Sequence, residues 1–196
     1  INPIYVYGHT KAMCEKLLIS AAEANEKIKY CILRYFNPVG AHSSSLIGED
    51  PLGTPNNLIP YLSQVATGKF NSLHVYGKDY DTRDGTGVRD YIHIDDLVEG
   101  HYSSLNYLNS DKKNLICNLG TGKGYSVLKI AKVFEDVSGK KINLKFMSRR
   151  EGDIDCSYAD VTKASNTLNW SAKKDLIQMC ESSWKWQSEN PQGYDI

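Results

Sequence analysis

The chain has 196 residues, 41% of them hydrophobic and 23% charged, which is the composition of an ordinary globular protein. Its 23 basic and 23 acidic side chains balance, so the net charge gives no sign of binding to nucleic acid or to an anionic membrane. No apolar run approaches the ~18 residues that span a bilayer, and the five cysteines lack the CxxC spacing of a zinc site. We therefore expect free thiols, no bound metal and a cytoplasmic location.

The first third of the chain predicts a helix, a strand and a long loop. The helix spans residues 8–27, and one of its faces is apolar: Met13, Leu17, Ala21 and Ala24. Residues 28–36 are nearly continuous in apolar character, which is typical of a buried parallel strand. Residues 37–57 are rich in Gly, Pro and Ser, and loops of this length in compact domains are often functional.

Helix and strand signals continue to alternate along the rest of the chain, which indicates an α/β fold. Asp95 and Ser126 are expected to cap two of the helices, and Gly139 to end the second. The expected elements are a helix from 58, a strand at 73–77, a turn-rich loop at 79–87, a strand at 88–94, a helix to 108, a strand at 114–120, a helix at 127–138, a strand at 142–147 and a helix from 173 to 186.

The segment YGHTK places Tyr7 and Lys11 four residues apart, on one face of the first predicted helix. A free tyrosine titrates near pH ~10, and a neighbouring cation favours its phenolate. Such a pair can therefore serve as a general base. A Tyr-x-x-x-Lys match by itself is weak evidence, because many helices contain one by chance.

More specific segments surround this pair. They are LRYFNPVGAH (33–42), GEDPLGTPNNLIPY (48–61), GKDYDTRDGTGVRDYIHIDDL (77–97) and RREGDI (149–154). In this order they resemble the UDP-galactose 4-epimerases, a family of the extended short-chain dehydrogenase/reductase superfamily, and the resemblance covers essentially the whole chain. RYFNPVGA and DGTGVRDYIH are the most specific of the segments, and they separate this family from the related nucleotide-sugar dehydratases.

The resemblance implies a reaction and a cofactor, NAD. The residue that Tyr7 matches takes the proton from the sugar 4-hydroxyl, while NAD takes a hydride from C4 and returns it to the other face of a 4-keto sugar. The residue that Lys11 matches contacts the nicotinamide ribose and keeps the tyrosine acidic. Tyr35 and Phe36 match residues that line the nicotinamide and also touch the substrate.

The resemblance also implies how a UDP-sugar is held. Arg89 and Arg150 match a clamp on the diphosphate, for which guanidinium has a suitable forked geometry. Asp153 matches an acceptor for a ribose hydroxyl, and Arg149 and the Asp95–Asp96 pair are expected to be structural. The other implied substrate residues are Asn37 at the sugar diphosphate, Asn56, Asn57 and Leu58 at a helix start, His74, Val75 and Tyr76 beside the uracil, Glu151 and Gly152 between the arginine and the aspartate, and Ser157.

Ser157 bears on the range of substrates. In the family, the residue at its spacing beyond Asp153 forms a wall beside the sugar 2-position, and a small residue leaves space for an acetamido group. We therefore expect UDP-GlcNAc and UDP-GalNAc as substrates besides UDP-glucose and UDP-galactose. The register in DIDCSYAD is uncertain by one residue: Cys156 would preserve this expectation, and Tyr158 would reverse it.

The resemblance assigns the chain to two parts of an enzyme. Residues 1–40, with 88–122 packing back on them, are expected to end a Rossmann-type, NAD-binding parallel sheet domain. Residues 41–87 and 123–196 are expected to form a smaller α/β substrate-binding domain. The chain opens with Ile1 and contains no G-x-x-G-x-x-G loop. We therefore expect a C-terminal portion that is inactive alone, in a full-length protein that pairs as a homodimer.

Three alternatives remain open at this point. The protein could be a UDP-glucuronate epimerase or decarboxylase, although RYFNPVGAH and NNLIPY disfavour that reading. It could instead be a non-catalytic module that binds a nucleotide sugar, which would have no use for an activated tyrosine. Finally, NLGTGKGYSV (118–127) resembles a dinucleotide-binding turn, but its G-x-G-x-G spacing favours a plain strand-to-helix turn.

Overall fold

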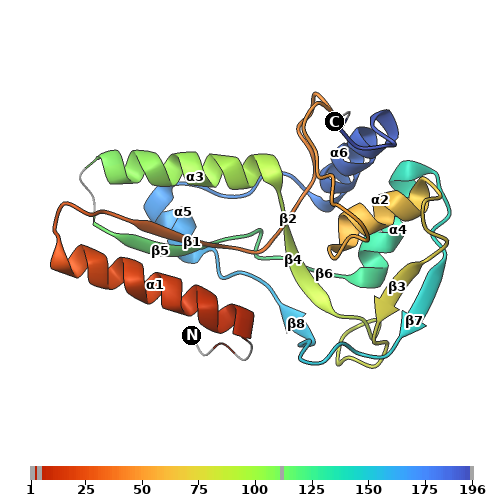
Figure 1. Cartoon of the computed structure of the whole chain (residues 1–196), viewed down its shortest axis with the longest axis horizontal. Helices are drawn as coiled ribbons and strands as arrows, with labels where there is room; N and C mark the ends of the chain where they lie inside the picture. The colour runs from red at the N-terminus through yellow and green to blue at the C-terminus, as the bar shows by residue number, and fades with distance from the viewer. Residues whose placement is uncertain (1–2, 4–5, 111–112, 195–196) are drawn as a thin grey trace.

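The computed structural model describes residue 3 and residues 6–110 and 113–194, which form the α/β fold that the sequence predicts (Figure 1). The helices are α1 (Val6–Ala24), α2 (Leu58–Ala66), α3 (Ile94–Asn109), α4 (Val127–Ser138), α5 (Thr162–Leu168) and α6 (Leu176–Glu189). The strands are β1 (Cys31–Tyr35), β2 (Asn37–Val39), β3 (Leu73–Tyr76), β4 (Val88–His93), β5 (Leu115–Leu119), β6 (Gly124–Ser126), β7 (Leu144–Met147) and β8 (Cys156–Ser157).

Three small groups of strands make up the sheet structure. β1 pairs in parallel with β5, and β3 pairs in parallel with β7. β4 is the centre of the third group, because β2, β6 and β8 all pair with it. The chain therefore passes from one sheet to another between Tyr35 and Asn37, where β1 ends and β2 begins (Figure 1).

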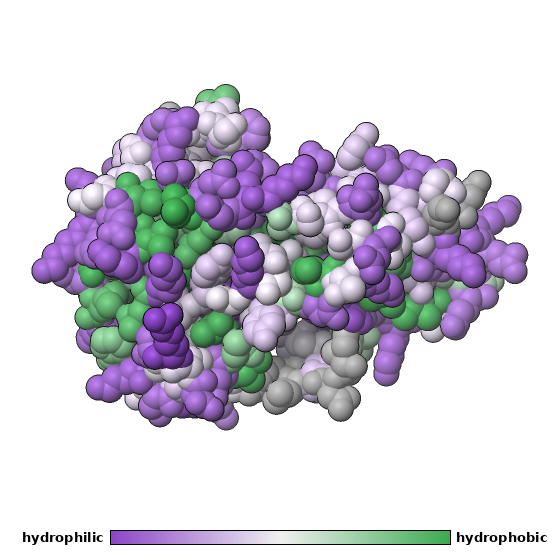
Figure 2. Space-filling model, turned by 180° about the vertical axis from the view of Figure 1, so that it is seen from behind, coloured by the Kyte–Doolittle hydropathy of each residue, from purple (hydrophilic) through white to green (hydrophobic). Residues whose placement is uncertain are grey.

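Two hydrophobic cores lie on either side of this transition. One joins β1, β5, α3 and α5, and its buried members are Ile92, Leu97, Leu115, Cys117, Leu119, Ala164, Leu168 and Trp170. The other joins α2, α4 and α6 to β3, and its most deeply buried side chains include Leu62, Leu73, Ile130, Phe134 and Met179. Hydrophobic side chains also reach the surface over the part that carries α2, α4, β3 and β7 (Figure 2).

The elements that the sequence does not predict are short. β2, β6 and β8 have two or three residues each and exist through their pairing with β4. A local sequence pattern cannot predict a strand of this length, because the stability of the strand comes from the strands beside it. α5 was also missed, because its seven residues carry few apolar side chains, of which Ala164 and Leu168 are buried.

The caps of α3 and α4 test two predictions. Ser126 caps α4 by accepting a hydrogen bond from the backbone N of Lys129, and Gly139 ends it in the left-handed conformation (φ 64°), as predicted. The prediction that Asp95 caps α3 is wrong, because His93 is the N-cap and its Nδ1 accepts from the backbone N of Asp95 at 3.0 Å. β4 runs directly into α3, so the last strand residue takes the capping position.

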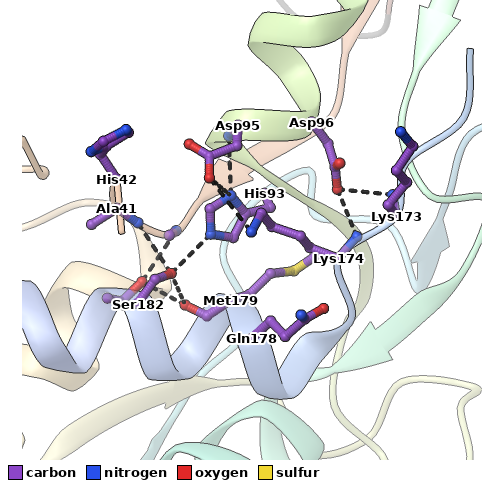
Figure 3. Close-up of polar contacts among 12 residues, drawn as sticks. Ala41, His42, His93, Asp95, Asp96, Lys173, Lys174, Gln178, Met179 and Ser182 are labelled. Atoms are coloured by element: carbon purple, nitrogen blue, oxygen red, sulfur yellow. Dashed lines mark hydrogen bonds and ion pairs between the residues drawn. The ribbon is translucent and has the colours of Figure 1, made fainter. Parts of the chain in front are cut away.

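His93 also joins three parts of the chain (Figure 3). Because Nδ1 accepts a hydrogen bond, Nε2 carries the proton and donates to Ser182 Oγ of α6 at 2.9 Å. Ser182 Oγ in turn accepts from the backbone N of Ala41 at 3.2 Å. Nearby, the Asp96 carboxylate accepts from the backbone N of Lys173 and of Lys174, which fixes the approach to α6.

α1 lies along the β1–β5 pair on the side away from α3 (Figure 1). The Arg34 guanidinium of β1 donates to Glu15 of α1, with Nε and Oε1 2.6 Å apart. No residue of α1 is buried, and Met13 and Leu17 of its predicted apolar face are 63% and 71% exposed.

Among the described residues, no helix is long and apolar enough to cross a membrane.

Candidate functional site

A cavity of about 300 Å³ opens where β2, β3 and β4 meet the start of α2. It brings together side chains that are more than a hundred residues apart in the sequence. Nine residues of the predicted substrate site line it: Asn37, Asn56, Asn57, Leu58, His74, Tyr76, Arg89, Arg150 and Asp153. The sheet topology explains this convergence, because β2 and β4 run in parallel and the loops after β3 and β7 return to the same place.

Two arginines give the cavity its positive charge. Arg89 comes from β4, and its Nη2 lies 3.2 Å from Oδ1 of Asp153. Arg150 comes from the loop after β7, and its guanidinium stacks 4.0 Å from the centre of the Tyr76 ring. Guanidinium groups held in this way can receive an anion such as a diphosphate through charge-assisted hydrogen bonds.

The start of α2 forms another wall. Asn57 is the N-cap residue, in extended conformation, but its side chain makes no capping hydrogen bond. Its Nδ2 donates instead to Oε1 of Glu49 at 3.1 Å. The side chain of Asn57 is therefore not used to cap α2. The first backbone N–H groups of a helix are suited to an anion.

Asn37 is fixed at the sheet transition. Its Nδ2 donates to the backbone O of Asp90 at 2.7 Å, and its register partner on β4 is Tyr91. The side-chain oxygen of Asn37 remains as an acceptor beside the cavity.

Several predicted site residues do not line this cavity. Val75 is fully buried in the core, so its side chain does not reach the cavity. Glu151 and Gly152 belong to the turn after Arg150, and Ser157 lies on β8 opposite Arg89 in the register. Tyr35 and Phe36 lie at the end of β1, where the Tyr35 ring is 53% exposed and 5.8 Å from that of His101.

Tyr7 and Lys11 are neighbours on α1, also outside the cavity. The Lys11 Nζ lies 5.1 Å from the centre of the Tyr7 ring, and the tyrosine is 74% exposed. The helix therefore presents the phenol and the ammonium on one face, as their spacing predicts.

Three tyrosines that were not among the predicted site residues also line the cavity: Tyr61, Tyr80 and Tyr91. Burial raises the pKa of Tyr91 to about 12, so its hydroxyl is a neutral donor. A signal for Tyr91 existed, because it follows Arg89 by two residues in a strand and so shares its face. Likewise Tyr61 lies one helical turn after Asn57. Tyr80 lies in a loop, and no periodic pattern points to it.

The backbone N–H groups of the glycine-rich turn after β5 are already bound by a side chain of the chain. The Asp90 carboxylate, fully buried, accepts from the backbone N of Thr121, Gly122 and Ala159 at 2.9–3.1 Å. These donors are therefore not available to a phosphate. The prediction of a direct strand-to-helix turn is only partly right, because the turn leads into β6 (Gly124–Ser126) before α4 begins.

No group of three or more His, Cys, Asp or Glu side chains is arranged to hold a metal ion within residues 6–110 and 113–194. The polar groups described above are instead those that recognise an organic anion. Together with a Tyr–Lys helix beside a parallel strand pair, they define the class to which the chain is assigned. It belongs to the NAD dependent epimerase/dehydratase family, whose sequence model matches residues 1–120.

Comparisons with individual proteins point to one group within the family. The chain is 53% identical over 188 residues to the UDP-glucose 4-epimerase of Bacillus subtilis (strain 168), an alignment that covers 96% of this chain and 56% of the relative. The chain thus spans about half the length of the curated relatives it matches.

Solved structures agree. A UDP-glucose 4-epimerase from Stenotrophomonas maltophila, with bound NAD and formylated UDP-arabinopyranose, superposes with a TM-score of 0.92 at 46% identity over 95% of this chain and 55% of that one. The enzyme from Bifidobacterium longum, in complex with NAD+ and UDP, gives 0.91 at 46% identity over 96% of this chain and 56% of that one.

Proposed function

We propose that the protein to which this chain belongs catalyses the NAD-dependent epimerisation of UDP-sugars at C4, interconverting UDP-glucose and UDP-galactose. The observation that carries the proposal is the single cavity in which nine residues expected from sequence motifs converge. The relatives named UDP-glucose 4-epimerase, and the two similar structures with NAD and a UDP ligand, support it.

Each wall of the cavity has a part in holding the substrate. Arg89 and Arg150 bind the diphosphate, helped by the backbone N–H groups at the start of α2. Asp153 accepts a hydrogen bond from a ribose hydroxyl, and the strand of His74, Val75 and Tyr76 lies beside the uracil. Asn37 meets the sugar end of the diphosphate, next to β1.

The residues at the end of β1 and on α1 fit the nicotinamide end of NAD. Ligands of open α/β sheets bind beyond the carboxyl ends of parallel strands, where Tyr35 presents a half-exposed ring and Phe36 follows. Lys11 places a cation one turn from Tyr7, and we assign to it the contact with the nicotinamide ribose. Bound there, NAD supplies the acceptor and donor of the hydride at C4.

Tyr7 is the general base of the proposal. Its phenolate oxygen accepts the proton of the sugar 4-hydroxyl and returns it to the 4-oxygen after the sugar has turned its other face. Lys11 stabilises the phenolate by its charge. A module that only binds nucleotide sugars would gain nothing from this pair, and the similarity to relatives named UDP-glucose 4-epimerase favours the 4-epimerase over a UDP-glucuronate enzyme.

We further propose a homodimer that works in the cytoplasm, where thiols such as the five free cysteines of this chain stay reduced. The division into a cofactor part (1–40 with 88–122) and a substrate part (41–87 with 123–196) also remains a proposal. Two separate cores support this division. One element departs from it: α5 belongs to the segment assigned to the substrate part, but it packs in the core of β1 and β5.

The test is Tyr7→Phe in the full-length protein. The variant should lose about 10²–10⁴-fold in turnover, which is the usual contribution of general acid–base catalysis, and should bind UDP as the wild type does. His9→Gln, on the same exposed helix, is the control and should remain active. If Tyr7→Phe keeps a turnover within about threefold of the wild-type value, Tyr7 is not the base.

A further inference from the structure

Tyr80 lies in the loop between β3 and β4 and has no role in the proposal so far. Its side chain lines the cavity and is only 4% exposed. Both of its backbone groups are bound, because its N donates to the O of Gly85 at 3.0 Å and its O accepts from the N of Thr82 at 2.8 Å. The loop therefore holds this residue in one place.

The ring of Tyr80 is fixed as well. The Arg149 guanidinium stacks 4.1 Å from its centre. On another side, Gly77 has a φ of +79°, and a Cβ at that position would lie 2.4 Å from the Tyr80 ring. Only a glycine allows this close approach. The direction of the hydroxyl is thus set by packing and does not depend on a hydrogen bond.

The hydroxyl is the unusual feature. It is buried, and within the described ranges it has no hydrogen-bond partner. A buried donor without a partner destabilises the folded state, whereas phenylalanine would fill the same space without that loss. A group retained at such a cost is expected to find its partner in another state of the site.

Arg89 and Asp153 line the same cavity as Tyr80. Burial raises its pKa, the Asp153 carboxylate raises it further, and Arg149 and Arg89 act in the opposite direction. The hydroxyl is therefore a protonated donor, and it shares the cavity with the Asp153 carboxylate. In the structure that carboxylate is paired with Arg89, whose Nη2 is 3.2 Å away.

We propose that Tyr80 is a positioning residue whose hydroxyl donates to Asp153 when a nucleoside diphosphate has engaged Arg89. The inference rests on the proposed function of the cavity. A diphosphate competes with Asp153 for the guanidinium, because both are oxyanions. Asp153 then loses a donor, and Tyr80 replaces it and keeps the carboxylate directed at the ribose.

The first experiment is calorimetric titration of the full-length protein with UDP. Tyr80→Phe should weaken UDP binding by about three- to tenfold, the effect of one hydrogen bond. Its thermal midpoint without ligand should equal or exceed that of the wild type, a result that a purely structural tyrosine would not give. Tyr102→Phe removes an exposed hydroxyl from α3, outside the cavity, and should change neither quantity.

A double-mutant cycle tests the route through Asp153. In an Asp153→Ala background, which offers no side-chain acceptor, Tyr80→Phe should change the dissociation constant by less than about twofold, because coupled residues are not additive. An undiminished effect in that background would overturn the inference. A second measurement needs no variant: UDP should bring the Tyr80 hydroxyl proton of the wild type into slow exchange in NMR spectra, and a fast-exchanging proton in the complex would also overturn it.

The outcomes separate the two proposals. If the wild-type full-length protein binds UDP and its Tyr80→Phe variant binds it equally well, the role of Tyr80 is refuted and the function of the cavity stands. If the wild-type full-length protein shows no binding of UDP at millimolar concentration, the assignment of the cavity is refuted, and the role of Tyr80 is refuted with it.

Discussion

Ser157 lies beside the cavity without lining it. It is the register partner of Arg89 on β4, and it is half-buried, whereas Cys156 is exposed and Tyr158 is 59% exposed. Successive side chains of a strand point to opposite faces, so Cys156 does not share the face of Ser157. This difference offers a matched pair of variants for the expected acceptance of N-acetylated sugars.

We expect Ser157→Tyr in the full-length protein to lose activity selectively on UDP-GlcNAc and UDP-GalNAc, because a bulky ring would fill the space of the acetamido group. Steady-state assays on both substrate pairs measure the effect, which should exceed about tenfold, or about 1.4 kcal/mol. Cys156→Tyr is the control on the other face. Equal activities of Ser157→Tyr and wild type on the two pairs would rule out this gate.

Asp90 is the residue on which the junction of β4, the turn after β5 and β8 depends. Its fully buried carboxylate accepts three backbone hydrogen bonds and one from the Thr121 hydroxyl at 2.5 Å. Backbone N–H groups that lose such a partner in the interior remain without a substitute.

Asp90→Ala should therefore lower the free energy of unfolding by more than about 3 kcal/mol, since hydrogen bonds to charged groups contribute about 1.5–3 kcal/mol each and more than one is lost. Asp90→Asn keeps one acceptor oxygen and should lose less. Urea denaturation measures both, with Asp81→Ala, an exposed carboxylate, as the control. A loss below about 1 kcal/mol for Asp90→Ala, less than one such bond, would contradict the account.

At the scale of elements, the start of α3 couples β4 to α6. His93 is 1% exposed and is held neutral by its own hydrogen bonds, with Nδ1 as an acceptor (Figure 3). Burial lowers its pKa below the ordinary value of 6.5, and the charge of Lys174 acts in the same direction, against Asp95 and Asp96. Protonation would break the cap, because Nδ1 could no longer accept from Asp95.

This arrangement predicts how stability depends on pH. The unfolded chain protonates this histidine below about pH 6.5, while the folded chain resists until its lower pKa is reached. The free energy of unfolding should therefore fall as the pH drops through this window, by at most about 1.4 kcal/mol per pH unit from this group.

Urea midpoints of wild type and His93→Asn, measured from about pH 8 to 5, test the prediction, because asparagine can cap the helix but does not titrate there. The variant should be less stable at neutral pH and should lose less on acidification. An identical pH dependence of the two proteins would show that His93 does not contribute.

At the scale of the whole molecule, α1 is a poorly covered helix. None of its residues is buried, and Met13, Leu17 and Leu18 are 63%, 71% and 47% exposed. An apolar stripe of this kind on a helix is typical of a surface that packs against another element or another copy. We therefore expect α1 to contribute to the proposed homodimer.

Light scattering of the full-length protein at micromolar concentration should give the mass of a dimer. Leu17→Glu should shift it toward the monomer, because a charge would have to be buried in the interface. Glu23→Lys also changes a charge on α1 but lies outside the stripe, and it should leave the dimer intact. A wild-type protein that is monomeric throughout would refute the proposal.

The sequence by itself determined the class of fold and pointed to nine of the residues that line the cavity. Helix periodicity places Tyr7 beside Lys11, and local chemistry predicts the caps at Ser126 and Gly139, because these features depend on neighbours within a few residues. Nine cavity residues also follow from short motifs, although the motifs say nothing of where they meet.

Only the tertiary structure decided what depends on contacts between distant segments. β2, β6 and β8 exist through β4, and His93 joins the end of β4 to Ser182 of α6. The Asp90 carboxylate fills a turn that resembles a phosphate site, and Tyr80 reaches the cavity from an aperiodic loop. The free energies of these contacts come from burial and from partners more than thirty residues away, which no local pattern encodes.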